Sequence, residues 1–489
     1  MMNNEIKFGT DGWRSIMGES FTYDNVRRVA QATCDVLRQK SKTRLILIGY
    51  DHRFLSEDFA LTAARVAVEN GYRVEISDQP ITSPVLSYQV KTRKATIGIM
   101  ITASHNPPPF NGFKLKGPHG GSVDESLTRQ IEEQIDISEP RWGDSVGKRT
   151  DFVGGYLKWL KKLTPLLSLS KLKETCVLDS MYGPGGNIFE NGFGSKITHL
   201  IRKESDPLFG GINPEPIEKN LKFLKEVMIQ KKAGVGLALD GDGDRVGVID
   251  NKGRYLPPHL VMPLLMEHLI VNRKLKGDII QTVSMGYLPE RIAKEHKLGF
   301  EEVPVGFKHV ASKIRDKKVL FGGEESGGYG VGLWSAERDG LLCSLLILEA
   351  LCKTKKSLSD LIDQLQEKYG QSIFKRVDFR LKESIDKELW TQKITNHIGS
   401  KFGKHVIRKI NPLDGVKVIM EDDSWVLMRP SGTEPLIRTY SEAKSAVIVN
   451  ELLSEAERLV QIPMTRQSKQ SGRKEAGSRK KSKHSPLVK

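Results

Sequence analysis

The sequence predicts an α/β protein whose sheets are largely parallel. Six apolar segments rich in β-branched residues each end in a turn of Gly, Asp or Ser, and such continuous apolar runs are typical of strands buried on both faces. Amphipathic stretches between them, such as residues 58–71 and 260–275, predict helices, so the alternation indicates βαβ units. The six predicted strands are residues 44–51, 95–104, 174–183, 235–244, 278–286 and 318–328.

Length and cysteine usage narrow the class of protein. The 489 residues allow three or four domains, because a domain usually takes about 100–200 residues. The four cysteines show no close pair with metal-site or redox spacing, which suits a reducing compartment. The N-terminus has no apolar signal segment, and no run of 18 apolar residues occurs. We therefore expect a cytoplasmic protein without a membrane span.

The formal net charge of +16 is unevenly distributed. Residues 463–489 contain nine Lys or Arg residues and one Glu. The net charge of this segment is therefore half of the net charge of the whole chain. This basic tail is polar, and we expect it to be disordered. The modest charge of the remainder suits an anionic substrate such as a sugar phosphate. Because no aromatic platform or nucleic-acid motif accompanies the tail, a nucleic-acid partner is not favoured, and the sequence does not indicate an oligomeric state.

The segment TASHNPPPFNGFKLK (102–116) places Ser104 at the end of an apolar strand. His105, Asn106 and three prolines follow, and the prolines prevent a helix from starting at once. A serine hydroxyl becomes a nucleophile only with a base, a metal or prior activation. A serine that merely caps a turn is the alternative. The G-x-S-x-G elbow of the α/β-hydrolases is absent.

The segment DGDGDR (240–245) offers three carboxylates, from Asp240, Asp242 and Asp244. Alternation with glycine allows all three to face one hard cation. An EF-hand is excluded, because the sixth position is Arg245 and the twelfth is Asn251. A solvated acidic turn is the alternative, although three carboxylates would repel one another without a cation.

Two further segments carry groups that suit hydroxyl-rich or phosphate-bearing ligands. GGEESGG (322–328) combines glycines with carboxylates, which accept hydrogen bonds from sugar hydroxyls. RPSGTEPLIR (429–438) combines guanidinium groups, hydroxyls and unobstructed backbone, as in a phosphate cradle, and is not a Walker A loop. Each segment alone is compatible with a simple turn.

Taken together, the motifs resemble the successive signatures of the α-D-phosphohexomutase superfamily over roughly residues 5–460. The resemblance implies four domains around a central cleft, three of them mixed α/β units with largely parallel sheets and the fourth a smaller C-terminal α+β domain. The expected spans are 1–150 with a phosphoserine loop, 151–255 with a metal-binding loop, 256–370 with a sugar-binding loop, and 371–462 with a phosphate-binding loop. The matching segments are FGTDGWR (8–14), TASHNP (102–107), DGDGDR (240–245), GEESGG (323–328) and RPSGTEPLIR (429–438).

The resemblance also implies an isomerase that moves a phosphoryl group through a phosphoserine and is activated by a hexose 1,6-bisphosphate. Ser104 would carry the phosphoryl group and, with Asp240, Asp242 and Asp244, would hold Mg²⁺. Lys114, Arg14 and His105 would assist the transfer. The expected substrate-binding residues are Arg245, Gly306, Lys308, Glu324, Ser326, Arg429, Ser431, Gly432, Thr433 and Arg438.

The expected substrate is glucose 1-phosphate, converted to glucose 6-phosphate. Many phosphomannomutase-like members have a histidine where this chain has Gly328, and the loop PVGFKHV (304–310) is similar to that of the phosphoglucomutases. A phosphomannomutase or a dual-specificity enzyme is the alternative. A phosphoglucosamine mutase is expected less, because a 2-amino group close to Lys308 would meet a like charge.

Overall fold

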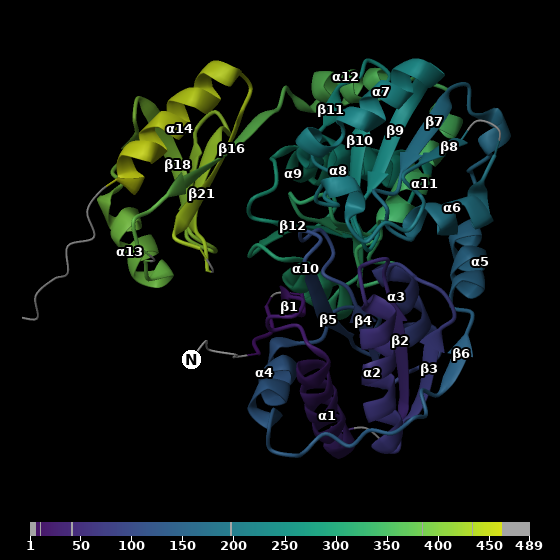
Figure 1. Ribbon diagram of the computed structural model, residues 1–489. Helices are drawn as coiled ribbons and strands as arrows, with labels where there is room; N and C mark the ends of the chain where they lie inside the picture. The colour runs from purple at the N-terminus through teal and green to yellow at the C-terminus, as the bar shows by residue number, and fades with distance from the viewer. Residues whose placement is uncertain are drawn as a thin grey trace, which may run out of the picture.

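The computed structural model describes residues 6–9, 11–40, 43–195, 198–383, 385–432 and 434–461, so Thr433 and the predicted tail lie outside the described residues. Four separate sheets follow one another along the chain. Figure 1 shows the first domain at the bottom, the second and third above it, and the C-terminal domain at the upper left. The predicted fold class is confirmed, whereas the exact domain boundaries stay predictions. No described helix has the length and apolar character that a membrane span needs.

The first sheet has the strand order β1-β5-β4-β2-β3-β6, in which β5 runs antiparallel to both β1 and β4 and the remaining pairs are parallel. Helix α2 shows why such helices form, since its buried residues recur at helical spacing on one face. The elements are β1 (Trp13–Ile16), α1 (Tyr23–Lys40), β2 (Leu45–Tyr50), α2 (Ser56–Glu69), β3 (Arg73–Ser77), α3 (Ser83–Thr92), β4 (Ile97–Ile101), β5 (Phe110–Lys116), α4 (Glu125–Gln134) and β6 (Lys148–Thr150).

The second sheet has the order β11-β10-β9-β7-β8, with parallel pairing among β7, β8 and β9. Its elements are α5 (Val153–Leu163), η1 (Leu169–Lys171), β7 (Thr175–Asp179), α6 (Gly185–Phe193), β8 (Thr198–Ile201), η2 (Phe209–Gly211), η3 (Glu218–Asn220), α7 (Lys222–Lys231), β9 (Ala233–Leu239), β10 (Val246–Ile249) and β11 (Tyr255–Leu256).

The third sheet has the order β13-β12-β14-β15, with β12 parallel to both β13 and β14. The predicted helix 260–275 is an α-helix followed by a short π-helix. The elements are α8 (Pro258–Glu267), η4 (His268–Asn272), β12 (Asp278–Thr282), α9 (Leu288–Glu295), β13 (Phe300–Val303), α10 (Phe307–Asp316), β14 (Val319–Gly323), β15 (Tyr329–Gly330), α11 (Gly340–Thr354) and α12 (Leu358–Tyr369).

The C-terminal sheet has the order β16-β21-β20-β19-β18-β17 and is antiparallel throughout. Strand β16 connects it to the third domain, as Figure 1 shows. The elements are β16 (Ile373–Arg380), α13 (Lys387–His397), β17 (Lys401–Phe402), β18 (His405–Asn411), β19 (Val416–Met420), β20 (Trp425–Pro430), β21 (Leu436–Ala443) and α14 (Ala446–Val460).

The same local arrangement recurs in the first three domains. Strand β4 pairs antiparallel with β5, β9 with β10, and β14 with β15. Each predicted functional loop is therefore the turn of a hairpin that begins at the carboxyl end of a parallel strand. Because ligands of open α/β sheets bind at these ends, the three loops are placed where the sheet architecture expects a site.

One apolar cluster spans all four domains and fixes these loops relative to one another, while the first and the C-terminal domains have further clusters of their own. A single cluster of buried side chains includes Leu86, Leu237, Leu346 and Trp425, one from each domain. Helix α11 is the central element, since residues 340–351 are all buried. Close packing of this kind resists small displacements.

Candidate active site

The predicted phosphoserine loop and the predicted metal-binding loop meet in a buried site. Ser104 follows β4 and is 0% exposed, and its hydroxyl donates to Asp240 Oδ2 at 3.0 Å. The backbone of Ser104 has a φ of 54°, in the left-handed region that costs a non-glycine residue about 1 kcal/mol or more. Such a conformation persists only where surrounding contacts hold it, and it is often found at functional sites.

The three predicted metal ligands form a compact group. One ligand oxygen from each of Asp240, Asp242 and Asp244 lies within 4.8 Å of the others, and all three residues are buried. Asp242 Oδ1 and Asp244 Oδ1 are buried atoms that have no hydrogen-bond partner among the described residues. Burial and the two neighbouring carboxylates raise the pKa of Asp240 well above its ordinary value. Clustered hard oxygen donors with unused lone pairs fit Mg²⁺.

Glycine at position 241 is required by a close approach between these two loops. A Cβ atom there would lie 2.5 Å from the carbonyl oxygen of Ser104. The DGDGD spacing therefore does more than turn the carboxylates toward one another, because it also lets the metal-binding loop rest against the serine.

Lys114 supplies a buried positive charge beside the triad. It lies on β5, and its Nζ is 2.7 Å from Asp11 Oδ2 and 2.8 Å from Asp242 Oδ2. Burial opposes the charged form, but Asp11, Asp242 and Asp244 together raise the pKa of Lys114. Lys114 is therefore a cation at neutral pH in this arrangement.

Asp11 was not among the predicted site residues, although it lies in the TDGWR segment. Its carboxylate contacts Lys114 and accepts a hydrogen bond from Arg14 Nη2 at 3.4 Å. Although burial disfavours its charged form, the surrounding cations lower the pKa of Asp11 well below its ordinary value. Asp11 thus connects the N-terminal segment to Lys114.

His105 lies beside the serine, and Arg14 Nη1 donates to Asn106 Oδ1 in the same loop at 2.8 Å. His105 Nδ1 lies 3.4 Å from Ser104 Oγ and 2.5 Å from Arg245 Nη1. Burial, then Arg245 and Arg14, lower the pKa of His105 well below its ordinary value, so the ring is neutral. Its Nδ1 accepts from Arg245, which leaves Asp240 as the acceptor of the Ser104 proton in this structure.

Arg338 is a buried cation that was not predicted. It donates from Nη1 to Glu324 at 2.7 Å and from Nη2 to Asp244 at 2.6 Å and to Asp11 at 3.1 Å. It thereby joins the sugar-binding loop to the metal-binding loop. The signal in the sequence is the segment SAERDG (335–340), where three ionisable residues stand directly before an apolar helix.

The residues next to Arg338 extend this connection to the other domains. Glu337 accepts a hydrogen bond from Ser87 at 3.0 Å and pairs with Lys116 in the first domain. Tyr156 of the second domain donates its hydroxyl hydrogen bond to Asp339, with distances of 2.9 Å to Oδ1 and 2.8 Å to Oδ2. Consecutive residues of the third domain therefore contact both of its neighbours.

The sugar-binding loop follows β14 and reaches the metal-binding loop. Val246 N donates to Gly327 O at 3.1 Å, and Glu324 Oε1 accepts from Ser326 Oγ at 2.7 Å. Glu324 is buried, while Ser326 is exposed. Glu324 is thus linked to the triad through Arg338, which contacts both Glu324 and Asp244, and Ser326 contacts Glu324.

Lys308 is directed differently. Its Nζ lies 2.9 Å from Glu125 Oε2 at the start of α4 in the first domain. The neighbouring Gly306 precedes α10, and no hydrogen bond or ion pair described here connects either residue to Ser104 or the triad. Their predicted role in substrate binding stays a prediction.

The predicted phosphate cradle lies in the turn between β20 and β21. Arg429 Nε donates to Asp414 Oδ2 at 2.7 Å, and Arg438 Nη2 donates to Glu434 at 3.2 Å. Ser431 Oγ accepts from Glu434 N at 3.3 Å, and Gly432 is exposed. No described contact joins these residues to Ser104, so the cradle forms a separate part of the site.

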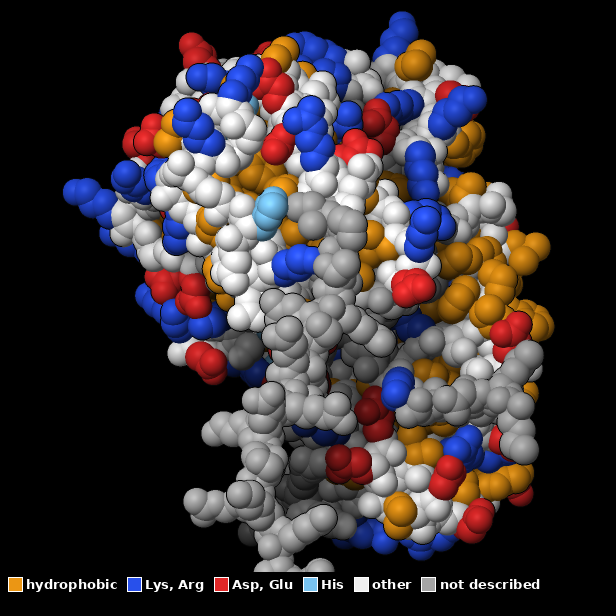
Figure 2. All heavy atoms as spheres, turned by 90° about the vertical axis from the view of Figure 1, so that its left-hand side faces the viewer, with side chains coloured by type: hydrophobic (Ala, Val, Ile, Leu, Met, Phe, Trp, Pro, Cys, Tyr) orange, Lys and Arg blue, Asp and Glu red, His pale blue; other side chains and the backbone are white. Residues whose placement is uncertain are grey.

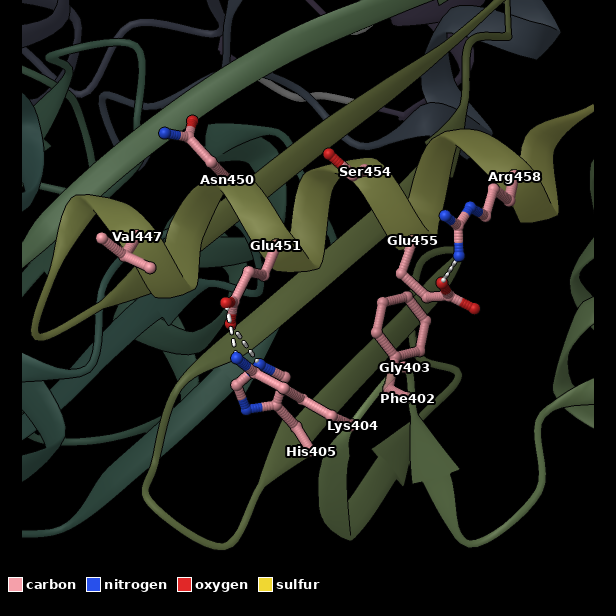
Figure 3. A pocket seen from close by; sticks show the side chains of 10 residues that line it. All are labelled: Phe402, Gly403, Lys404, His405, Val447, Asn450, Glu451, Ser454, Glu455 and Arg458. Atoms are coloured by element: carbon pink, nitrogen blue, oxygen red, sulfur yellow. Dashed lines mark hydrogen bonds and ion pairs between the residues drawn. The ribbon is translucent and has the colours of Figure 1, made fainter.

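A groove of about 560 Å³ elsewhere in the C-terminal domain is not part of this site. It lies between α14 and the β17–β18 hairpin, and its charged side chains pair with one another, Glu451 with Lys404 and His405, and Glu455 with Arg458 (Figure 3).

The face of the molecule drawn in Figure 2 shows Lys and Arg side chains with Asp and Glu among them, rather than one continuous basic stripe.

Comparisons with known proteins agree with this geometry. Family models described as phosphoglucomutase/phosphomannomutase match in all four parts, namely alpha/beta/alpha domain I at residues 5–141, domain II at 155–253, domain III at 257–369 and the C-terminal domain at 392–459.

Relatives and solved structures are similar to this chain over almost its whole length. A phosphoglucomutase/phosphomannomutase of Thermococcus kodakarensis is 30% identical, covering 91% of this chain and 96% of its own. A phosphoglucosamine/phosphogalactosamine mutase of Sulfurisphaera tokodaii is 30% identical, covering 93% and 99%. The crystal structure of a putative phosphomannomutase from Thermus thermophilus is 32% identical with a TM-score of 0.80, covering 93% and 99%.

These matches and the fold define a phosphohexomutase, an isomerase of carbohydrate metabolism. The chain belongs to the phosphoglucomutase/phosphomannomutase family of the α-D-phosphohexomutase superfamily.

Replacing Gly328 with alanine is expected to lower kcat by about 10- to 100-fold. A Cβ at this position would lie 2.3 Å from Arg338 Cδ and 3.1 Å from Glu324 Oε1, so it would displace the guanidinium that contacts the triad. A displacement of about 1 Å in a catalytic arrangement can cost about 100-fold in rate. Steady-state kinetics on hexose 1-phosphates measure the effect. Gly192→Ala is the matched control, because its Cβ would lie 2.6 Å from Leu157 Cδ2 outside the site. An equal loss of kcat in both variants would contradict the role given to Arg338.

Proposed function

We propose that this phosphohexomutase interconverts glucose 1-phosphate and glucose 6-phosphate through a phosphorylated Ser104. The supporting observation is the buried Ser104 hydroxyl, 3.0 Å from Asp240 in a triad with unused carboxylate oxygens. Phosphoryl transfer depends mainly on positioning and on neutralising negative charge. The site offers both, because the serine is rigidly placed and cations surround it.

Asp240, Asp242 and Asp244 would hold Mg²⁺ together with the phosphoserine. When bound, Mg²⁺ would neutralise part of the charge of the transferring group. Lys114 and Arg338 supply further fixed positive charge beside the triad. Lys114, which is predicted to assist the transfer, is held beside the triad by its contacts with Asp11 and Asp242.

The remaining predicted residues would bind the sugar and its distal phosphate. Glu324 is linked to the triad through Arg338 and, with Ser326, would contact hydroxyls, while Arg14, His105 and Arg245 would border the reacting phosphate. A hexose 1,6-bisphosphate would serve as intermediate and activator, because it can present either phosphate to Ser104. The distal phosphate would be held by Arg429, Ser431, Gly432, Thr433 and Arg438, with Gly306 and Lys308 assisting at the sugar.

Glucosamine phosphates are a second candidate substrate, and they are better supported than the sequence alone predicted. The relative from Sulfurisphaera tokodaii is named a phosphoglucosamine/phosphogalactosamine mutase. Lys308 would repel an amino sugar only as a free cation, whereas its Nζ lies 2.9 Å from Glu125 Oε2. Its charge is thereby largely compensated, so repulsion of a 2-amino group is weak. Mannose phosphates remain a third candidate.

Coupled assays on the 1-phosphates of glucose, glucosamine and mannose test the substrate. We expect the highest kcat/KM on glucose 1-phosphate, in the presence of Mg²⁺ and the matching bisphosphate. A higher kcat/KM on glucosamine 1-phosphate would select the second candidate. Lack of turnover on all three would contradict the proposed function. Lys308→Met is informative here, because it should leave the order of the glucose and glucosamine substrates unchanged if the ion pair already neutralises the lysine.

A further inference from the structure

The side chain of Arg53 lies against the loop that carries Ser104. Its guanidinium donates four hydrogen bonds, and all four acceptors are main-chain carbonyl oxygens of this loop. Nη2 contacts Ser104 O and Asn106 O, each at 2.7 Å, and Nη1 contacts Pro107 O at 3.0 Å and Phe110 O at 2.9 Å. Arg53 is 3% exposed, so these bonds are shielded from water.

The composition of the loop explains why an external donor is needed. Residues 107–109 are prolines, which have no N–H group and cannot form a hydrogen-bonded ladder of their own. Buried carbonyl groups nevertheless require partners. A planar guanidinium with several N–H groups in a fixed fork can serve four carbonyls at once, whereas a lysine ammonium cannot reproduce that geometry.

The peptide groups on both sides of the Ser104 Cα are held. Its N–H donates to Thr102 Oγ1 at 2.9 Å, and its carbonyl accepts from Arg53. The Thr102 hydroxyl in turn donates to Asp51, which also accepts from the Arg53 backbone N–H at 3.0 Å. These bonds together hold the left-handed conformation of Ser104, whose φ is 54°.

The second domain covers the guanidinium from another direction. The ring of Phe209, in η2, lies with its centroid 4.8 Å from Arg53 Cζ. Phe209 is itself fully buried. Arg53 is therefore fixed between the serine loop and an aromatic side chain of the neighbouring domain, which limits its freedom to move.

We propose that Arg53 is a positioning residue for the nucleophile, holding the 104–110 loop so that Ser104 Oγ faces the carboxylate triad. This rests on the proposed role of Ser104 as the phosphoryl carrier. Arg53 acts through the backbone of Ser104 and does not bind the sugar. Its loss should therefore slow phosphoryl transfer while leaving substrate binding nearly intact.

Arg53→Lys tests this inference. We expect kcat to fall about 100-fold, since a small misplacement of the nucleophile is enough for such a loss, with KM changed by less than about threefold. Phosphorylation of Ser104 by a hexose bisphosphate should slow to a similar degree, as measured by mass spectrometry over time. In Arg53→Ala, added methylguanidinium should restore part of the lost kcat, because it replaces the missing fork.

The matched control is Arg202→Lys. Arg202 is also buried and pairs with a buried carboxylate, donating from Nε to Asp179 at 2.8 Å, but donates no hydrogen bond to the serine loop. We expect it to lower the melting temperature without the loss of kcat. If Arg53→Lys loses no more kcat than this control, or if its loss appears entirely in KM, the inference is wrong.

Thr102→Val extends the test to a variant of nearly unchanged shape, should Arg53→Lys fail to fold. It removes the acceptor of the Ser104 N–H and should lower kcat with little effect on KM. Unchanged kcat in a folded Thr102→Val protein would overturn the inference. A wild-type protein without activity on any hexose phosphate would instead refute the proposed function, so the two failures are distinguishable.

Discussion

The Ser104→Ala protein is expected to retain its fold and lose turnover by about 10⁴-fold or more, as is typical when a covalent nucleophile is removed. The substitution deletes one hydroxyl, and its hydrogen bond to Asp240 contributes about 1 kcal/mol. The melting temperature should therefore change by only a few degrees. Turnover is measured in the coupled assay, and peptide mass spectra should show phosphate on Ser104 in the wild type and none at this position in the variant.

Ser83→Ala is the matched control for this change. Ser83 is another fully buried serine whose hydroxyl donates to a triad carboxylate, that of Asp242. Because Ser104, and not Ser83, is the proposed carrier, we expect a loss of less than about tenfold, of the size of one hydrogen bond. Comparable losses in the two variants would show that Ser104 is only a structural donor.

Removing divalent cations is the second change with a large expected effect. Chelation should lower wild-type turnover by about 10³-fold or more, because a bound cation stabilises the negative charge of the transition state by several kcal/mol. Added Mg²⁺ should restore the turnover. Mg²⁺ should also raise the melting temperature, since it binds the folded triad and relieves repulsion among its carboxylates. Asp242→Asn should weaken both effects, because one hard anionic ligand becomes neutral.

Asp250→Asn serves as the control for the metal experiment. Asp250 is a fully buried aspartate of the same domain, but it pairs with Arg254 rather than with the triad. It should reduce stability and leave the Mg²⁺ dependence unchanged. Full activity of the wild type after thorough chelation would exclude the metal site.

The strands that position the site could be predicted from the sequence, because their apolar runs report burial directly. Residues 95–104 and 235–244 contain β4 and β9, and their polar ends carry Ser104 and the triad. The antiparallel partners β5, β10 and β15 were not predicted. Strand β5 contains the polar and charged sequence FNGFKLK, whose lysines are buried only because carboxylates from other segments neutralise them.

The buried charges around the triad were harder to predict than the triad itself. Asp11, Arg53 and Arg338 act through contacts with residues far away in the sequence, for example Arg338 with Asp244. Local composition marks Asp11 and Arg338 only through the segments TDGWR and SAERDG, and it does not distinguish a buried charge from a surface charge. The C-terminal sheet is a similar case, since β16 has no buried residue in its eight positions and is recognisable only through its pairing with β21.

The most direct test of the central claim is whether phosphorylated Ser104 is a kinetically competent intermediate. Protein carrying phosphate on Ser104 is mixed rapidly with glucose 1-phosphate, and the phosphate remaining on the serine is followed by quenched-flow mass spectrometry. We expect the phosphate to leave Ser104 at a rate equal to or greater than kcat and to appear in glucose 1,6-bisphosphate. Transfer slower than kcat, or steady turnover while Ser104 carries no phosphate at any time, would contradict this claim.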